Sequence, residues 1–138
     1  MIFRYIRIKT PDGELIRLPL IPVRLTCNKQ HLDLYALIDS GAEVSAFNAS
    51  IAKTLNIEIK QGSFLTLSGF VGGDTDSYLR QVHMSIQGLP EIDILAAFTE
   101  VDAPSMPILG QRGFFDNYQI RFHRYRDQIE IYPKSTNI

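Results

Sequence analysis

Apolar and polar residues alternate in short runs along most of the chain, which is the two-residue period of half-buried β-strands. The alternation is clear at Val82, Met84 and Ile86, and two runs near the end of the chain repeat it. Turn-forming residues such as Pro11-Asp12-Gly13 separate the runs. The pattern predicts strands at Ile2 to Ile8, Leu15 to Leu20, Val23 to Thr26, Leu32 to Ile38, Phe64 to Leu67, Tyr78 to Ile86, Ile92 to Phe98, Tyr118 to Phe122 and Gln128 to Tyr132.

Helical signals are few. Asn48 is a suitable N-cap for a short helix from Ala49 to Leu55, in which Ile51 and Leu55 share one face. The segment from Gly110 to Asp116 predicts a second short helical turn. Many short strands with little helix predict an all-β fold, closed into a barrel or packed as a sandwich.

The composition is that of an ordinary globular protein, with 45% hydrophobic and 21% charged residues. A net charge of −1 supplies no field that would gather nucleic acid or anionic lipid, so we expect neither as a partner. Cys27 is the only cysteine, which is compatible with a reducing compartment. No run approaches the ~20 apolar residues of a membrane span, and early basic residues argue against a signal peptide. We expect a soluble cytoplasmic protein.

The 138 residues contain no linker, repeat or low-complexity tract. A chain of this length can bury a core without disulfides or metals. We therefore expect one domain over residues 1–138, in which residues 1–20 form an N-terminal hairpin extension.

The most informative stretch places a carboxylate directly after a buried apolar run. Asp39 follows Leu37 and Ile38, and Ser40-Gly41 predicts a tight turn after it. Burying an unpaired carboxylate costs several kcal/mol, so an acid here needs a compensating arrangement. One such arrangement is a second carboxylate that shares a proton with the first. Because the chain carries one such motif, the second carboxylate would come from another chain.

Asp39-Ser40-Gly41-Ala42 resembles the Asp-Ser/Thr-Gly-Ala active-site motif of the retropepsin-like aspartic proteases. Pro107-Ile108-Leu109-Gly110 resembles the apolar-apolar-Gly segment that passes beside the catalytic loop in that family. Between them, a glycine-rich stretch from Leu67 to Gly73 stands where the family carries its flap. The resemblance implies a retropepsin-like closed β-barrel, equivalent to half of an acid protease, with one or two short helices and a flap hairpin.

The resemblance also implies an activity. The chain would be a homodimeric aspartic endopeptidase that hydrolyses peptide bonds by activating water between two Asp39 carboxylates, with no metal and no other cofactor. Ser40, Gly41 and Ala42 would form the active-site loop. The flap over a bound peptide or protein substrate would comprise Gly69, Phe70, Val71, Gly72 and Gly73, and the loop would be supported by Glu43, Ile108, Leu109, Gly110 and Arg112.

One part of the family pattern is changed. In retroviral members an acid four residues after the catalytic Asp pairs with an Arg directly after the Leu-Gly or Ile-Gly. This chain has Glu43 and Gln111 at those positions, and Arg112 comes one place later. We expect the ion pair to be altered or rebuilt as Glu43–Arg112, which affects dimer strength and not the carboxylate pair.

Simpler interpretations stand beside these. Asp-Ser-Gly is also a common surface turn, and a glycine cluster is often a passive loop. A serine hydrolase built on Ser40 or Ser68 would lack the Gly-x-Ser-x-Gly motif. The alternative function on the same fold is a binding or dimerisation module that no longer cleaves.

Two further chemistries have weaker support. His31, His83 and His123 are far apart without metal-ligand spacing, which indicates ordinary surface or half-buried histidines. The basic and aromatic run Arg121 to Arg126 favours an outer strand face followed by a turn over an RNA-binding surface.

Overall fold

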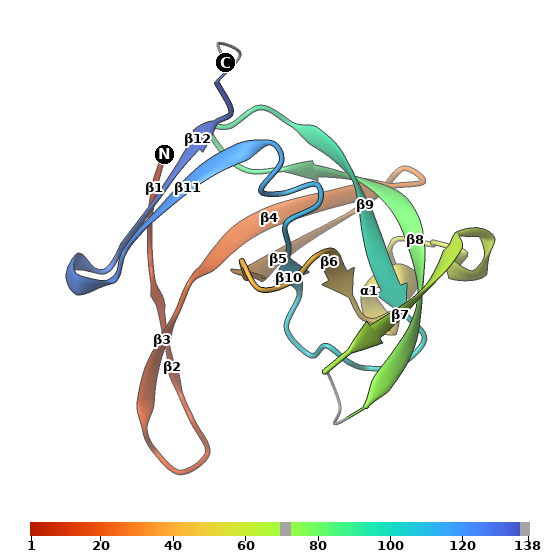
Figure 1. Cartoon of the computed structure of the whole chain (residues 1–138), viewed down its shortest axis with the longest axis horizontal. Coiled ribbons are helices and arrows are strands. Elements are labelled where there is room, and N and C mark those ends of the chain that lie inside the picture. The colour runs from red at the N-terminus through yellow and green to blue at the C-terminus, as the bar shows by residue number, and fades with distance from the viewer. Residues whose placement is uncertain (70–72, 136–138) are drawn as a thin grey trace.

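The computed structural model of the chain describes residues 1–69 and 73–135, and strands dominate it (Figure 1). The strands are β1 (Ile2–Arg4), β2 (Ile6–Lys9), β3 (Leu15–Leu18), β4 (Leu20–Cys27), β5 (Gln30–Ile38), β6 (Ser45–Phe47), β7 (Ser63–Ser68), β8 (Asp74–Ser85), β9 (Ile92–Thr99), β10 (Ile108–Leu109), β11 (Tyr118–His123) and β12 (Gln128–Pro133). Helix α1 (Ala49–Thr54) and the 3-10 helices η1 (Ile59–Gln61) and η2 (Arg124–Arg126) complete it. The predicted all-β class is confirmed.

Six of the described strands close into a barrel around the main core. Neighbouring strands follow the order β4-β5-β10-β6-β9-β8, and β8 returns to β4 by pairing Met84 with Leu25. Strand β7 extends this sheet by pairing with β8. The alternation at Val82, Met84 and Ile86 turns all three side chains into the protein. Other side chains that are almost wholly buried include Ile21, Leu25, Phe47, Ile94, Phe98 and Leu109.

Helix α1 forms where it was predicted, and it packs against the main core. The side-chain oxygen of Asn48 accepts a 3.2 Å hydrogen bond from the N–H of Ile51, which satisfies one of the free donors at the helix start. Ile51 and Leu55 are buried on the same side.

The terminal strands form a second sheet beside the barrel, in the order β1-β12-β11. Strand β12 lies in the middle, so both of its edges are occupied by strands of the same chain. Ile129 and Ile131 of β12 are fully buried and join the main core. A separate two-stranded hairpin, β2 with β3, projects away from the rest of the molecule (Figure 1).

Three details differ from the sequence predictions. The strand predicted from Ile2 to Ile8 is interrupted at the buried Tyr5, and its halves enter different sheets. Strands β6 and β10 had no predicted counterpart. Gly110 to Asp116 forms hydrogen-bonded turns and not a helix, with the N–H of Asp116 donating to the carbonyl of Gln111. Gly113 in this segment has a φ of +91°, which interrupts helical geometry.

Candidate active site

Asp39 lies immediately after the last residue of β5, at the start of a tight loop. Its main-chain carbonyl accepts a 3.2 Å hydrogen bond from the N–H of Ala42, which closes the turn. Its carboxylate oxygen Oδ1 accepts a 2.9 Å hydrogen bond from the N–H of Gly41. The side chain is half-buried, and these bonds fix its direction relative to the strand end. An ionised or proton-sharing carboxylate benefits from such a main-chain donor.

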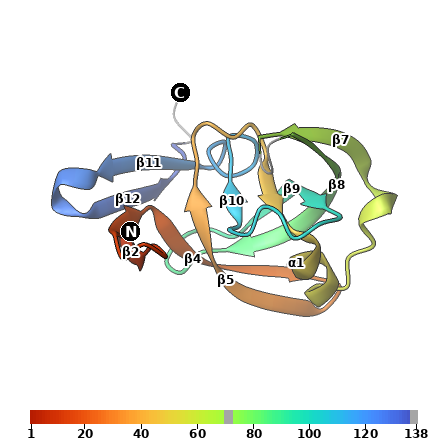
Figure 2. The same ribbon diagram turned by 90° about the horizontal axis from the view of Figure 1, so that it is seen from below.

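Strand β10 brings the two sequence motifs together. It runs parallel to β5 and pairs Ile108 with Leu37 and Leu109 with Ile38. The N–H of Asp39 then donates a 3.0 Å hydrogen bond to the carbonyl of Leu109. In Figure 2, β10 lies between β5 and β6, and the loop joining those two strands arches at its end. The acid is therefore positioned by a segment about seventy residues downstream.

Gly110 allows the main chains to approach closely. A Cβ atom at this position would lie 2.7 Å from the carbonyl oxygen of Ala42 and would also overlap the carbonyl of Val44. The N–H of Gly110 donates a 3.1 Å hydrogen bond to the Oγ of Ser45, which is fully buried. Ser45 was not among the predicted site residues, although it is the one polar residue in the apolar run from Val44 to Phe47.

Main-chain pairing continues beyond Gly110. The N–H of Gln111 donates to the carbonyl of Ala42, and the N–H of Arg112 donates to the carbonyl of Glu43, both at 2.8 Å. The side-chain amide of Gln111 donates a 2.6 Å hydrogen bond to the carbonyl of Ser40. Gln111 therefore braces the loop from the position where the family pattern has arginine.

The structure joins Glu43 and Arg112 through this main-chain hydrogen bond and a parallel bridge of Val44 with Arg112. No ion pair between the Glu43 and Arg112 side chains is recorded in the described part of the chain. Both side chains are exposed at the rim of the site. The rebuilt Glu43–Arg112 ion pair therefore stays a prediction for the expected homodimer.

A cavity of about 430 Å³ lies over Asp39. One wall is the loop with Gly41, Ala42, Glu43 and Val44, together with Arg112. The opposite wall is the stretch from Leu65 to Gly69 on strand β7 and the residue after it. A peptide-sized segment could lie between the acid and this wall in an extended conformation.

Strands β7 and β8 form the hairpin that was predicted around the glycine-rich stretch. They pair from Ser63 with Leu79 to Ser68 with Asp74, and Gly69 continues with a 3.3 Å hydrogen bond to Gly73. Cβ atoms at Gly69 or Gly73 would meet nothing within 4 Å, so the described end of the hairpin lies in open space. The predicted flap residues Phe70, Val71 and Gly72 lie outside the described residues.

The weaker candidates remain apart from the cavity. His83 contacts Asp93 and Glu91 on the far side of the barrel, and His123 lies near Glu130 in the terminal sheet. Within residues 1–69 and 73–135, no cluster of three or more His, Cys, Asp or Glu side chains could hold a metal ion. Ser68 donates to Asp74 across the β7–β8 hairpin.

Comparison with solved structures identifies the architecture. A retropepsin-like aspartic protease from Rickettsia conorii superposes with a TM-score of 0.62 at 15% sequence identity, covering 96% of this chain and 98% of its own. The chain has a retropepsin-like fold. The EIAV protease in complex with an inhibitor is also similar, with a TM-score of 0.50 and 24% identity over 68% of this chain and 82% of its own. At such identities the likeness concerns the fold alone.

Comparison at the level of sequence gives no further relative, since no protein-family model and no curated protein matches this chain. Among the residues that the structure describes, no helix is long and apolar enough to cross a membrane.

Proposed function

We propose that the protein is an aspartic endopeptidase that works as a homodimer, with Asp39 of each chain as the catalytic residue. The observation that carries the proposal is the setting of Asp39 at the floor of a cavity, held by the Gly41 N–H and by the main chain of Leu109. The retropepsin-like fold supports it, because one of the similar structures named above is an aspartic protease and the other is a protease. We treat residues 1–138 as one catalytic domain.

The proposed chemistry uses two carboxylates and one water molecule. Two Asp39 side chains that meet at a twofold axis cannot both ionise, so they hold one proton between them. The ionised member takes a proton from water as it attacks the peptide carbonyl, and the protonated member polarises that carbonyl. Activity should therefore be favoured at acidic pH, where the singly protonated pair is populated.

Each residue of the loop has a role in this proposal. The Gly41 N–H donor orients the Asp39 carboxylate, and the Gln111 amide holds the loop through the Ser40 carbonyl. The exposed hydroxyl of Ser40 is free to reach the partner's loop. The β7–β8 hairpin acts as a flap that covers an extended substrate and adds strand-type hydrogen bonds.

The test is digestion of a peptide library at several pH values, with Asp39→Asn as the control. An amide at this position cannot share or transfer the proton, so cleavage should disappear while the fold is retained. Residual activity of Asp39→Asn within about tenfold of the wild type would contradict the mechanism. We keep the cytoplasm as the predicted location, with Cys27 as a free thiol.

The competing function is a non-cleaving dimerisation module on the same fold. The observation that favours it is the replacement of the supporting arginine by Gln111, whose amide binds the loop of its own chain. A dimer that binds peptides and cleaves none of them at any pH, in wild type as in Asp39→Asn, would select this function.

A further inference from the structure

The β2–β3 hairpin has one apolar face that its own chain leaves half-exposed. Ile6 pairs with Leu18 and Ile8 pairs with Ile16, so these four side chains lie on the same face of the ribbon. All four are half-buried, and none belongs to or packs against either apolar core of the described chain. Leu15 is 67% exposed and lies on the opposite face, beside Lys9.

The polar face of the ribbon, in contrast, is used within the chain. Arg17 forms a 3.1 Å ion pair with Asp127 and donates to the carbonyl of Arg124, both in the turn between β11 and β12. Arg17 pairs with Arg7 across the ribbon and therefore points away from the Ile16 side. Anchoring through this face turns the apolar face away from the β11–β12 turn. An isolated two-stranded hairpin is at best marginally stable in water, so this face needs a covering surface.

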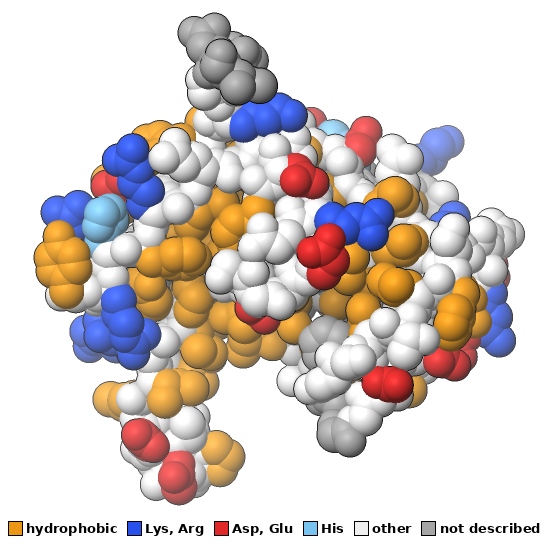
Figure 3. All heavy atoms as spheres, in the orientation of Figure 1, with side chains coloured by type: hydrophobic (Ala, Val, Ile, Leu, Met, Phe, Trp, Pro, Cys, Tyr) orange, Lys and Arg blue, Asp and Glu red, His pale blue; other side chains and the backbone are white. Residues whose placement is uncertain are grey.

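The root of the hairpin lies directly beside the proposed catalytic residue. The N–H of Ile38 donates a 3.0 Å hydrogen bond to the carbonyl of Pro19, and Leu20 pairs with Leu37. The C-terminal end of the ribbon therefore lies next to Ile38, the residue that precedes Asp39. By symmetry, a second copy that brings its own Asp39 to this point also brings the root of its own hairpin close to it. Figure 3 shows hydrophobic side chains on the hairpin and over the neighbouring front face of the molecule.

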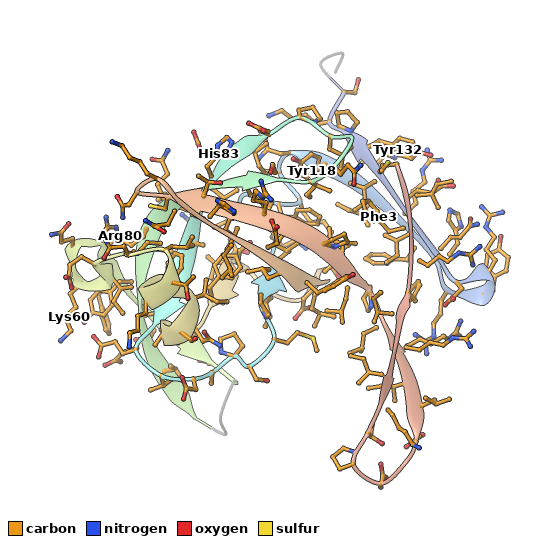
Figure 4. The ribbon with its side chains drawn as sticks, turned by 180° about the vertical axis from the view of Figure 1, so that it is seen from behind. Phe3, Lys60, Arg80, His83, Tyr118 and Tyr132 are labelled. Carbon is orange, nitrogen blue, oxygen red and sulfur yellow. The ribbon has the colours of Figure 1, made fainter. Side chains whose placement is uncertain are left out.

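The pairing within the terminal sheet limits the other ways in which a second copy could bind. Strand β12 is paired on both sides within the chain, by β1 from Ile2 to Arg4 and by β11. A partner therefore cannot add a strand along β12 from Gln128 to Ile131. Phe3 of β1 already packs against the core of its own chain, and Figure 4 shows its ring on the barrel side of the strand.

A stable dimer also needs more surface than the loop supplies. Specific interfaces bury about 800 Å² on each partner, from about 20–30 residues, and the loop Ser40 to Ala42 is only a small part of that. The net charge of −1 opposes self-association very little. A symmetric dimer uses the same patch on both subunits, so one apolar ribbon in each chain contributes to the interface twice.

We propose that the β2–β3 hairpin is a dimerisation arm whose apolar face, Ile6, Ile8, Ile16 and Leu18, packs against a second copy of this chain. The proposal rests on the proposed function, because the need for a second Asp39 identifies the occupant as another copy. It goes further in naming the surface that holds the copies together, which is the N-terminal hairpin and not the terminal strand β12.

Sedimentation velocity across a concentration series tests the arm, and adjacent residues provide a matched pair of variants. Ile16→Glu places a charge on the apolar face, and Leu15→Glu places the same charge on the outer face. Ile16→Glu should raise the dimer dissociation constant at least about tenfold, since a buried unpaired charge is costly. Leu15→Glu should stay within about twofold of the wild type, as exposed substitutions usually do.

A second variant separates dimerisation from folding of the ribbon. Ile8→Thr with Ile16→Thr keeps β-branched residues on both strands while removing apolar surface, so the hairpin should form and the dimer should still weaken. Equal effects of Ile16→Glu and Leu15→Glu, or a wild-type chain that stays monomeric, would overturn the arm.

The two proposals fail in different measurements. If Ile16→Glu weakens the dimer but the wild-type protein cleaves no peptide, the proposed dimerisation arm stands and the proposed peptidase activity is wrong. If the protein cleaves peptides as a dimer and Ile16→Glu leaves the dimer dissociation constant unchanged, the proposed peptidase activity stands and the proposed dimerisation arm is wrong.

Discussion

The N–H of Asp39 donates a 3.0 Å hydrogen bond to the carbonyl of Leu109. The main chain of the proposed catalytic acid is therefore held by a strand about seventy residues later in the sequence. Strand β10 consists of two residues and lies between β5 and β6. It adds main-chain hydrogen bonds to the last residues of β5 and to Asp39. The direction of the Asp39 side chain therefore depends on how tightly β10 can approach the loop, which leads to the first two predictions.

Gly110→Ala should be strongly destabilising. The added methyl group would overlap the carbonyl oxygens of Ala42 and Val44, which are main-chain atoms that cannot rotate away. Overpacking of this kind costs about 1–3 kcal/mol or more of unfolding free energy. Urea denaturation measures the loss, and Gly73→Ala is the control because its Cβ would meet nothing within 4 Å. Equal stability of the two variants would contradict the close approach.

Ser45→Ala should also destabilise the fold, because it removes the hydrogen-bond acceptor of the Gly110 N–H. The variant leaves the buried N–H of Gly110 without its acceptor, which costs about 1–3 kcal/mol. Thermal unfolding of Ser45→Ala and Ser50→Ala makes the comparison, since Ser50 is an exposed serine on helix α1. We expect a lower Tm for Ser45→Ala and little change for Ser50→Ala. A Tm for Ser45→Ala that matches the wild type would show that another group satisfies Gly110.

The expected hairpin over the cavity makes a separate prediction for Gly73. Gly73→Val should leave the free energy of unfolding nearly unchanged because the position is open. Turnover of peptide should nevertheless fall several-fold, since a β-branched residue stiffens the segment that the proposed flap uses to close. Paired measurements of urea stability and kcat check this. Normal kcat with unchanged stability would make the segment a structural turn.

His83 should make folding stability depend on pH. The carboxylates of Asp93, 2.9 Å from Nδ1, and Glu91, 2.8 Å from Nε2, accept hydrogen bonds from the protonated ring and so raise the pKa of this histidine. Because the folded protein binds the proton more tightly than the unfolded chain, the stabilisation is full below the unfolded pKa of about 6.5. It disappears as the pH rises through the raised pKa of the folded state.

Unfolding titrations between pH 5 and about pH 9 measure this contribution. The wild type should lose stability over that range relative to His83→Gln, in which the titrating group is absent. His31→Gln is the control and should follow the wild type, because this exposed histidine forms no ion pair within the described residues. A parallel pH course for wild type and His83→Gln would contradict the assignment.

Much of the fold was predictable because its strands repeat a clear pattern. The alternation at Val82, Met84 and Ile86 gave the long strand β8, and Asn48 gave the start of helix α1. Strands β6 and β10 were not predicted because two or three residues are too few to show a period. The turn after Gly110 was predicted as helical because no local pattern records the positive φ of Gly113 or its closeness to Ile94.

The candidate site was predictable to a similar extent. The pairing of the Asp39 loop with Ile108-Leu109 came from two short motifs, and the structure brings them together. Ser45 and the bracing role of Gln111 were missed, because both depend on contacts between segments far apart in sequence. The half-exposed apolar face of the hairpin was not predicted either. It depends on the break at Tyr5 that separates β1 from β2, and the sequence pattern predicted one continuous strand there.

The central claim is that two chains each supply one Asp39 to a single peptidase site, and mixing tests it most directly. Wild type is mixed with a threefold excess of Asp39→Asn at a concentration where both are dimeric, and peptide cleavage is measured after exchange. Random pairing leaves about a quarter of the wild-type chains in fully wild-type dimers, so activity should fall to about a quarter of the unmixed value. Activity that stays at the unmixed value would mean that one chain cleaves alone, which contradicts the account.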